Sequence, residues 1–140
     1  MAKQYNKSSQ NNSEAYRQLA EIEGTVPPQA IELEQAVLGA LMLEKDAIID
    51  VQEYIKPETF YTEEHRIIFQ AIQELSFNMK AIDLYTVTEC LKSHRQLTKV
   101  GGAAYLAQLT QRVASAAHIE FHAKIIAQKY VQRELIRSAT

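Results

Sequence analysis

The sequence predicts an all-α fold, and three observations support this prediction. The four glycines and three prolines among 140 residues lie mostly between segments whose apolar residues recur every three to four positions. No segment alternates apolar and polar residues over several positions, and no Asn-Gly or Asp-Gly hairpin turn occurs. Residues 115–140 contain neither glycine nor proline, and we expect one helix of about seven turns there. We therefore expect a compact bundle of about six helices that ends in a long helix.

The chain divides into three parts. Residues 1–27 form a polar tail, which we expect to be largely disordered because its run SSQNNS offers nothing to bury. Residues 28–114 hold most of the periodic segments and are expected to form a helical globular domain. Residues 115–140 are expected to form the long helix, with Ser115 as its N-cap.

Two helices are expected at the start of the globular domain. Apolar residues cover most of the surface of residues 29–43, which predicts a largely buried first helix. Asp46 is expected to cap a short second helix. We expect Pro57 to end this helix, because the residue before a proline is disfavoured in the helical conformation.

Three further helices are expected, each with its own start signal. Thr62 is expected to cap the third helix, and Asp83 is expected to cap the fourth, over residues 84–94. Gly101 and Gly102 are expected to supply positive φ angles, so that the loop turns sharply into the fifth helix.

The long last helix carries two rows of apolar residues. The first row has the spacing of a face buried against the domain, and it comprises Ile119, Ala123, Ile126 and Tyr130. The second row points in another direction and comprises Phe121, Ile125 and Ile136. No glycine or proline terminates this helix within the sequence, so we expect it to be part of a longer element.

Composition and charge argue against several classes of function. A net charge of −2 and a pI near 6.1 disfavour tight non-specific binding of nucleic acid, which needs clustered Lys and Arg. The single cysteine, Cys90, cannot form an internal disulfide, which is typical of a reducing compartment. The sequence has no apolar run of membrane-spanning length and no apolar segment of a signal peptide. We therefore expect a cytoplasmic protein without membrane contact.

Motifs for catalysis and cofactor binding are absent from the sequence. Its four glycines form neither a P-loop nor a G-x-G-x-x-G motif, so no nucleotide cofactor is expected for these residues. Cys90 has no helix-dipole or basic setting that marks it as a nucleophile, and we expect it to be a small buried hydrophobic residue. No catalytic residue is expected.

Two pairs of titratable residues were candidates for site chemistry. His118 and His122 share a helix face, but Glu120 lies on the opposite side and no spacing implies a third ligand, so no metal site is expected. Glu32 and Glu34 point about 200° apart on a helix and cannot share a substrate. We expect both carboxylates to be solvated or interface charges.

The last segment is mildly basic, and two interpretations stay open. A solvated helix face is favoured, and contact with a DNA strand is the alternative; the basic residues are Arg112, Lys124, Lys129, Arg133 and Arg137. The residues alone thus predict an all-α interaction domain without a catalytic site.

Four motifs in order resemble one protein family. Residues 27–43, PPQAIELEQAVLGALML, resemble the opening helix of the bacterial replicative DNA helicases of the DnaB type. Three later groups of residues resemble further motifs of that family. They are Phe60-Tyr61 with His65-Arg66 and Ile68-Phe69, Asp83 with Thr86-Val87, and Val100-Gly101-Gly102 with Tyr105-Leu106. Leu33 departs from the alanine that is usual in the family, which indicates local repacking.

The resemblance implies an all-helical N-terminal domain that ends in a helical hairpin, with residues 115–140 as the first arm and the second arm missing. It implies that such domains pair, and that three pairs form a collar on a hexameric ring. The collar would receive a DnaG-type primase, and a helicase loader is a further potential partner. ATP and Mg²⁺ would act in the family's ATPase domain, which the resemblance does not cover, so this domain would not be an enzyme.

Five residues are candidates for partner contacts. Phe121, Ile125 and Ile136 are expected to form a protein–protein surface on the long helix. Glu32 and Tyr105 are candidates for primase docking, and Tyr105 is equally compatible with a position in the core. The alternative function is direct binding of single-stranded DNA, although the charge predicts little of it.

Overall fold

The computed structural model describes residues 14, 15, 17, 26–112 and 118–139. Most of the tail that is expected to be disordered, and the expected cap at Ser115, lie outside the described residues. The described part contains six α-helices, one 3-10 helix and no strand, so the prediction of an all-α fold is confirmed. The elements are α2 (Ile31–Leu43), α3 (Ala47–Val51), η1 (Pro57–Thr59), α4 (Glu63–Phe77), α5 (Leu84–Ser93), α6 (Gly102–Gln111) and α7 (Ile119–Ala139).

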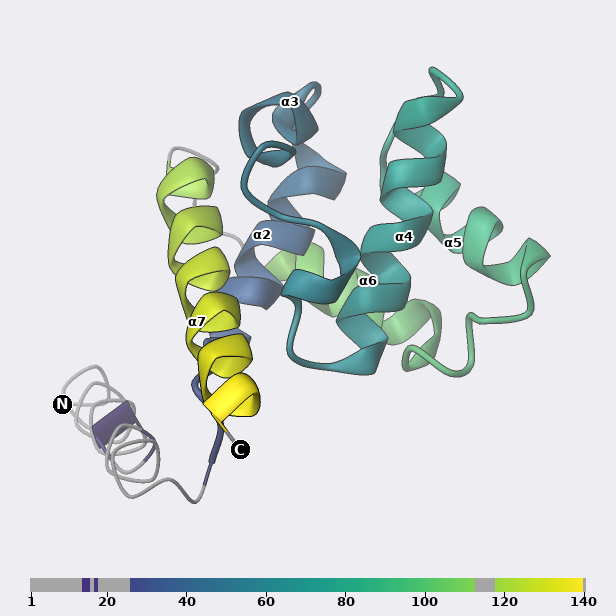
Figure 1. Ribbon diagram of the computed structural model, residues 1–140. Helices are drawn as coiled ribbons and strands as arrows, with labels where there is room; N and C mark the ends of the chain where they lie inside the picture. The colour runs from purple at the N-terminus through teal and green to yellow at the C-terminus, as the bar shows by residue number, and fades with distance from the viewer. Residues whose placement is uncertain (1–13, 16, 18–25, 113–117, 140) are drawn as a thin grey trace, which may run out of the picture.

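Helix α2 lies at the centre of the bundle. It contacts α3, α4, α5, α6 and α7, with α7 along one side and the α4–α5 pair beyond its other side (Figure 1). Its stretch Val37–Met42 is buried without interruption, which explains why the sequence there shows little amphipathic contrast. Leu33, where the family usually has alanine, is partly buried against the same core.

Local signals start two of the helices as predicted. The Thr62 side chain accepts a hydrogen bond from the backbone N–H of His65 at 3.2 Å. Asp83 and Thr86 form a capping box, in which each side chain bonds to the other residue's backbone N–H at 2.8 and 2.9 Å. Such reciprocal bonds satisfy amide groups that have no partner inside the helix.

The second helix differs from its prediction at both ends. Asp46 stands at the N-cap position with a φ of 64°, and its side chain makes no capping bond. Helix α3 ends at Val51, because a tight turn follows and carries Ile55 into the core. Pro57 therefore does not end α3. It begins η1 instead, where its fixed φ suits the first position of a helix.

The double glycine before α6 is required by the backbone. Gly101 and Gly102 have φ angles of 108° and 77°, as the sequence predicted. A Cβ atom at Gly101 would lie 2.9 Å from the Cβ of Tyr105, closer than side chains pack. The tight turn thus places Tyr105 against the start of its own helix.

Helix α7 packs on α2, α3 and η1 through the first predicted row of apolar residues. Ile119, Ala123 and Ile126 are buried, and Tyr130 is half-buried. At 21 residues, α7 is roughly 31 Å long. None of the described helices combines the length and apolar character needed to cross a bilayer.

Candidate functional site

The outer face of α7 is exposed and partly apolar. Phe121 and Ile136 of the predicted second row are 63% and 54% exposed, and Ile125 is half-buried. Val131 and Leu135, which were not among the predicted contact residues, are 54% and 66% exposed. Together these residues form the largest set of exposed apolar side chains on any one described helix.

Spacing could have identified Leu135 as a member of this face. Phe121, Ile125, Gln128, Gln132 and Leu135 follow one another at intervals of four, three, four and three residues. That alternation is the spacing of the contact positions of a coiled coil. We call these five residues the α7 seam; Ile136 lies beside its last member.

Glu32 lies at the start of α2 and is exposed, as expected. Its carboxylate forms an ion pair with Arg17, and this hydrogen bond holds the pKa of Glu32 below its usual value. Glu32 and Tyr105 do not belong to the α7 seam. They come from α2 and α6, so the structure does not gather the five predicted contact residues into one patch.

Tyr105 is half-buried and belongs to a chain of polar contacts. Its hydroxyl lies 2.7 Å from Nε2 of His65, and the two rings are stacked at 6.1 Å. Gln35 Nε2 donates to the Tyr105 Oη at 3.2 Å, and Arg112 donates to Oε1 of Gln35 at 3.1 Å. Tyr105 therefore links α6 to α2 and α4, and it is in large part a structural residue.

Glu34 closes this polar chain inside the core, which corrects the expectation that it is solvated. It is 1% exposed, and its Oε1 lies 2.8 Å from Nδ1 of His65, itself 2% exposed. Its Oε2 accepts the backbone N–H of Tyr61 at 2.8 Å. With a proton on Nδ1, His65 donates to Glu34 and accepts from Tyr105, so every contact in the chain has a donor and an acceptor.

A surface cavity of about 790 Å³ adjoins this chain of polar contacts. Its lining comes from α2, α4, α6 and the loops before α4 and α6, and it includes Ile31, His65, Val100 and Tyr105. Tyr105 thus lines the cavity, while its hydroxyl is already hydrogen-bonded within the fold.

Arg133 corrects a second expectation about solvated charges. Its guanidinium donates to the carbonyl oxygens of Pro28 and Thr59 at 2.9 and 2.8 Å, and it lies over the rings of Tyr61 and Tyr130. Burial lowers the pKa of Arg133. The side chain therefore fastens α7 to η1 and to the segment before α2, and is not free to bind phosphate.

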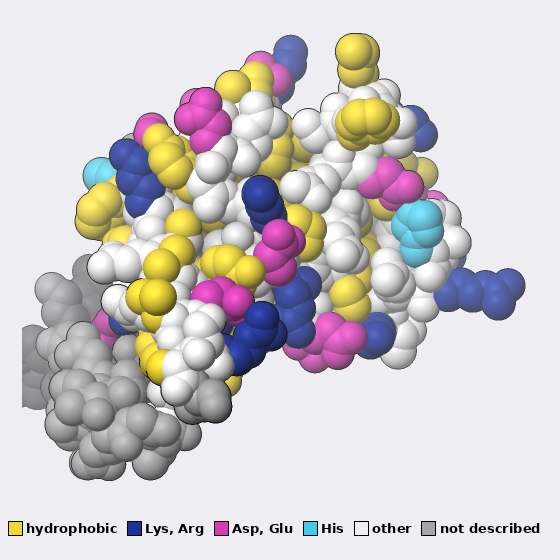
Figure 2. Space-filling model, in the orientation of Figure 1, with side chains coloured by type: hydrophobic (Ala, Val, Ile, Leu, Met, Phe, Trp, Pro, Cys, Tyr) yellow, Lys and Arg dark blue, Asp and Glu magenta, His cyan; other side chains and the backbone are white. Residues whose placement is uncertain are grey.

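Basic side chains do not form a continuous stripe on the face shown in Figure 2, where Lys and Arg alternate with Asp and Glu. Examples of such pairing are Lys99 with Glu63 at 3.0 Å and Lys124 with Glu120 at 3.6 Å. This distribution gives little support to a nucleic-acid groove.

Cys90 lies in a polar cluster that the sequence analysis missed. It is half-buried against the core, and its thiol donates to Oε2 of Glu74 at 2.9 Å. Burial, followed by the contact with Glu74, raises the pKa of Cys90 to about 11. The cysteine is thus a poor nucleophile, as expected, but it is not a purely hydrophobic residue.

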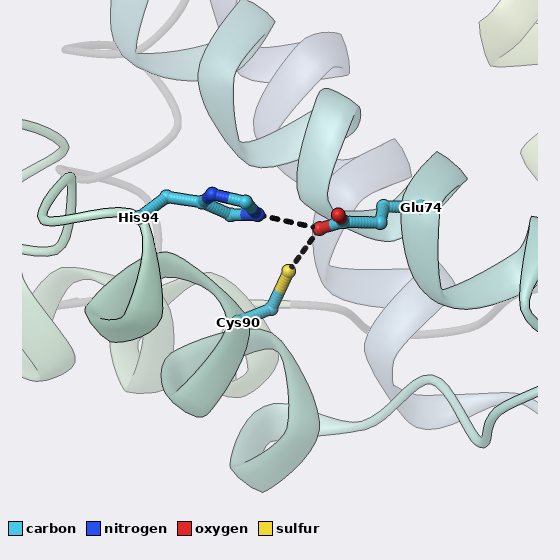
Figure 3. Close-up of side chains that lie close together, drawn as sticks. All are labelled: Glu74, Cys90 and His94. Carbon is cyan, nitrogen blue, oxygen red and sulfur yellow. Dashed lines mark hydrogen bonds and ion pairs between the residues drawn. The ribbon is translucent and has the colours of Figure 1, made fainter.

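His94 completes this cluster (Figure 3). Its Nε2 lies 2.8 Å from the same Oε2 atom of Glu74. The hydrogen bonds from Cys90 and His94 lower the pKa of Glu74. Among the described residues, Glu74, Cys90 and His94 alone bring three ligand-type side chains within 4.8 Å of one another.

His118, directly before α7, and His122 on α7 are not part of such a group. The rings of His118 and His122 are 6.3 Å apart, and no third ligand-type side chain of the described residues joins them. Burial, followed by the proximity of His118, lowers the pKa of His122.

Residues 26–128 match the family model of the DnaB-like helicase N-terminal domain. The chain belongs to this family. The replicative DNA helicase DnaB of Rhodothermus marinus is 51% identical over 110 residues, which cover 79% of this chain and 12% of that protein. DnaB of Geobacillus stearothermophilus is 44% identical over 115 residues, which cover 82% of this chain and 25% of that protein. The chain thus spans a quarter or less of the length of these DnaB relatives.

Solved structures agree with the family assignment. The N-terminal domain of DnaB helicase from Mycobacterium tuberculosis matches with a TM-score of 0.79 and 38% identity, over 81% of this chain and 83% of that one. A DnaB-like replicative helicase, solved in a study of its interactions with primase, matches with a TM-score of 0.70 and 26% identity, over 79% of this chain and 26% of that one. The matched region is the N-terminal domain of DnaB, so the prediction that the chain is a DnaB-type N-terminal domain is confirmed.

Proposed function

We propose that this DnaB N-terminal domain assembles the helicase collar and docks primase at the replication fork. Both roles need exposed surfaces that packing within a single domain leaves uncovered. The α7 seam is the observation that carries the proposal, because its apolar members lie on the side of α7 away from the core.

The seam fits a helix as its partner. Its heptad spacing suits an antiparallel or parallel helix lying along α7, with Phe121, Ile125 and Leu135 as contact residues. Gln128 and Gln132 place two amides in the middle of the seam, where polar residues fix register at some cost in stability. The occupants we propose are the second arm of a helical hairpin in the longer protein and a second copy of the domain.

The surface that we propose for primase docking lies at Glu32 and Tyr105, the predicted contact residues that are not on α7. Glu32 offers an exposed charge, and the cavity beside Tyr105 offers an apolar recess for a partner side chain. A DnaB-like relative of similar fold interacts with primase, which supports this part of the proposal. Aromatic and charged groups around a recess are typical anchors of protein interfaces.

The wider setting follows from the family. ATP and Mg²⁺ would act in an ATPase domain of the longer protein, and the domains would pair within a hexamer. A helicase loader is a further proposed partner, and the cytoplasm is the proposed location. Direct binding of single-stranded DNA is disfavoured because the chain is acidic overall and Arg133 is engaged within the fold.

The double substitution Leu135→Asp, Ile136→Asp tests the seam. Both side chains are more than half exposed, so the fold should tolerate the change. Loss of two buried contacts should weaken self-association by roughly 3 kcal/mol, or about a hundredfold. Analytical ultracentrifugation of the chain over a range of concentrations measures this effect, and titration with the primase's helicase-binding domain measures docking.

Phe77→Asp is the matched control, since Phe77 is 88% exposed but lies at the end of α4, outside the seam. The control should self-associate like the unmodified chain. Equal self-association of the double variant and the unmodified chain would contradict the assembly role. Docking of primase should survive the seam substitutions, because Glu32 and the Tyr105 cavity lie on other elements.

A further inference from the structure

Three side chains with different donor atoms converge between α4 and the end of α5. Figure 3 shows the Glu74 carboxylate pointing from α4 toward the Cys90 thiol and the His94 imidazole. Cys90 and His94 are four residues apart, so they share one face at the end of α5. Packing of α4 against α5 supplies the third group, which sequence spacing could not have revealed.

The geometry is close to that of a metal centre. The ligand atoms of the three side chains all lie within 4.8 Å of one another, and Glu74 Oε2 is 2.8 Å from the imidazole nitrogen and 2.9 Å from the sulfur. In a tetrahedral zinc site, the ligand atoms stand roughly 3.3–3.6 Å apart, given the usual zinc–ligand distances. Side-chain shifts of about an ångström would therefore convert the hydrogen-bonded cluster into a coordination shell.

We propose that Glu74, Cys90 and His94 form a binding site for a zinc-class divalent cation. A thiolate, an imidazole and a carboxylate are together the donor set that Zn²⁺ takes from proteins, whereas Mg²⁺ and Ca²⁺ prefer oxygen ligands only. The two negative charges of the thiolate and carboxylate would balance the dication. Binding releases the thiol proton of Cys90 to solvent, and the single ring proton of neutral His94 resides on Nδ1, which leaves Nε2 to bind the metal.

The surroundings leave room for the metal and for a fourth ligand. His94 and Glu74 are 50% and 44% exposed, so an ion can reach them from solvent. Surface hollows of about 410 and 380 Å³ meet at the cluster, and both include Glu74 and His94 in their lining. The fourth position would therefore hold water or a ligand from a partner, and the three protein bonds would clamp the end of α5 to α4.

Titration of the 140-residue chain with Zn²⁺ tests the proposal. Calorimetry should give saturable binding of one ion per chain, and zinc should raise the melting temperature. Co²⁺ should produce the near-ultraviolet charge-transfer absorption that reports a bond between cobalt and a thiolate. Mg²⁺ and Ca²⁺ should produce neither effect.

Single variants identify the ligands. Cys90→Ser, His94→Gln and Glu74→Gln should each weaken zinc binding by roughly a hundredfold. The charge-transfer absorption should be lost in Cys90→Ser. His122→Gln is the matched control, because it removes a histidine outside the cluster, and its affinity should equal that of the unmodified chain. Circular dichroism establishes that each variant remains helical, and Cys90→Ala replaces Cys90→Ser if the serine variant is unfolded.

Two results would overturn the proposal. One is the absence of zinc binding by the folded chain, which would leave Glu74 as a hydrogen-bond acceptor only. The other is binding that persists in Cys90→Ser and disappears in His122→Gln, which would place the ion at His118 and His122.

Discussion

Two histidine–glutamate pairs in the described residues have the same separation and opposite surroundings. A distance of 2.8 Å joins Nδ1 of His65 to Glu34, and the same distance joins Nε2 of His94 to Glu74. The first pair is 2% and 1% exposed, whereas the second is 50% and 44% exposed. Distance alone therefore does not decide what such a contact contributes.

Burial decides it. At the Glu34–His65 pair, every polar atom must find its partner within the protein, and Tyr61 and Tyr105 supply the remaining ones. At the Glu74–His94 pair, water can replace either partner at little cost. The buried pair thus holds three helices in place, while the exposed pair is free to exchange its hydrogen bonds for another ligand.

Glu34→Ala should have the largest effect on stability. It leaves the Nδ1 proton of His65 and the N–H of Tyr61 buried without acceptors, which should cost about 3–5 kcal/mol. Urea unfolding followed by circular dichroism measures the loss. Glu32→Ala is the matched control, since it removes an exposed carboxylate from the same helix. Similar losses of stability in the two variants would mean that the burial of Glu34 does not account for its contribution.

Tyr105→Phe should have an intermediate effect. The ring stays against the core, but Nε2 of His65 loses its hydrogen-bond donor, which should cost about 1–2 kcal/mol. Tyr85→Phe serves as the control, because Tyr85 is 72% exposed and its hydroxyl can bond to water. Equal urea midpoints for Tyr105→Phe and the unmodified protein would show that the hydrogen bond between Tyr105 and His65 does not contribute to stability.

Glu74→Gln should have the smallest effect, and the effect should depend on pH. Hydrogen bonds from Cys90 and His94 lower the pKa of Glu74 in the folded state. Its contribution to stability is therefore present above the unfolded pKa and is lost as the pH falls through the lower folded pKa. The variant should unfold at a slightly lower urea concentration at pH 7, and this difference should vanish between about pH 5 and pH 3.

Glu89→Gln, which changes an exposed carboxylate on α5, is the control for Glu74→Gln. A gap between Glu74→Gln and the unmodified chain that stays constant down to pH 3 would exclude the assigned contacts as its cause.

Helix starts and buried faces could be predicted from sequence because the signals are local. Thr62 and Asp83 bond to amides three residues away, and the Ile119–Ala123–Ile126 row follows helical spacing. The polar pairs could not be predicted in the same way. Glu34 meets a histidine 31 residues later, and Arg133 reaches a carbonyl 105 residues earlier. Helical periodicity indicates which face is buried, but it does not identify the partner.

Glu34 nevertheless had a signal in the sequence. It lies three residues before Val37 and four before Leu38, so it belongs to the buried face of α2. Arg133 likewise continues the buried row of α7, seven residues after Ile126. A charged residue at a buried position predicts a satisfied polar contact inside the fold, but Glu34 was expected to be a solvated or interface charge and Arg133 to lie on a solvated face.

The central position of α2 has a consequence for how the domain is made. Among the described helices, α2 is synthesised first and α7 last, so the surface of α2 that packs against α7 stays uncovered until α7 has been synthesised. Contacts between segments so far apart in sequence form slowly, because a long loop must close first. During synthesis, Val37, Leu38 and Leu41 would be exposed until the helices that pack against α2 have emerged, and a chaperone that binds apolar helices would find its target there.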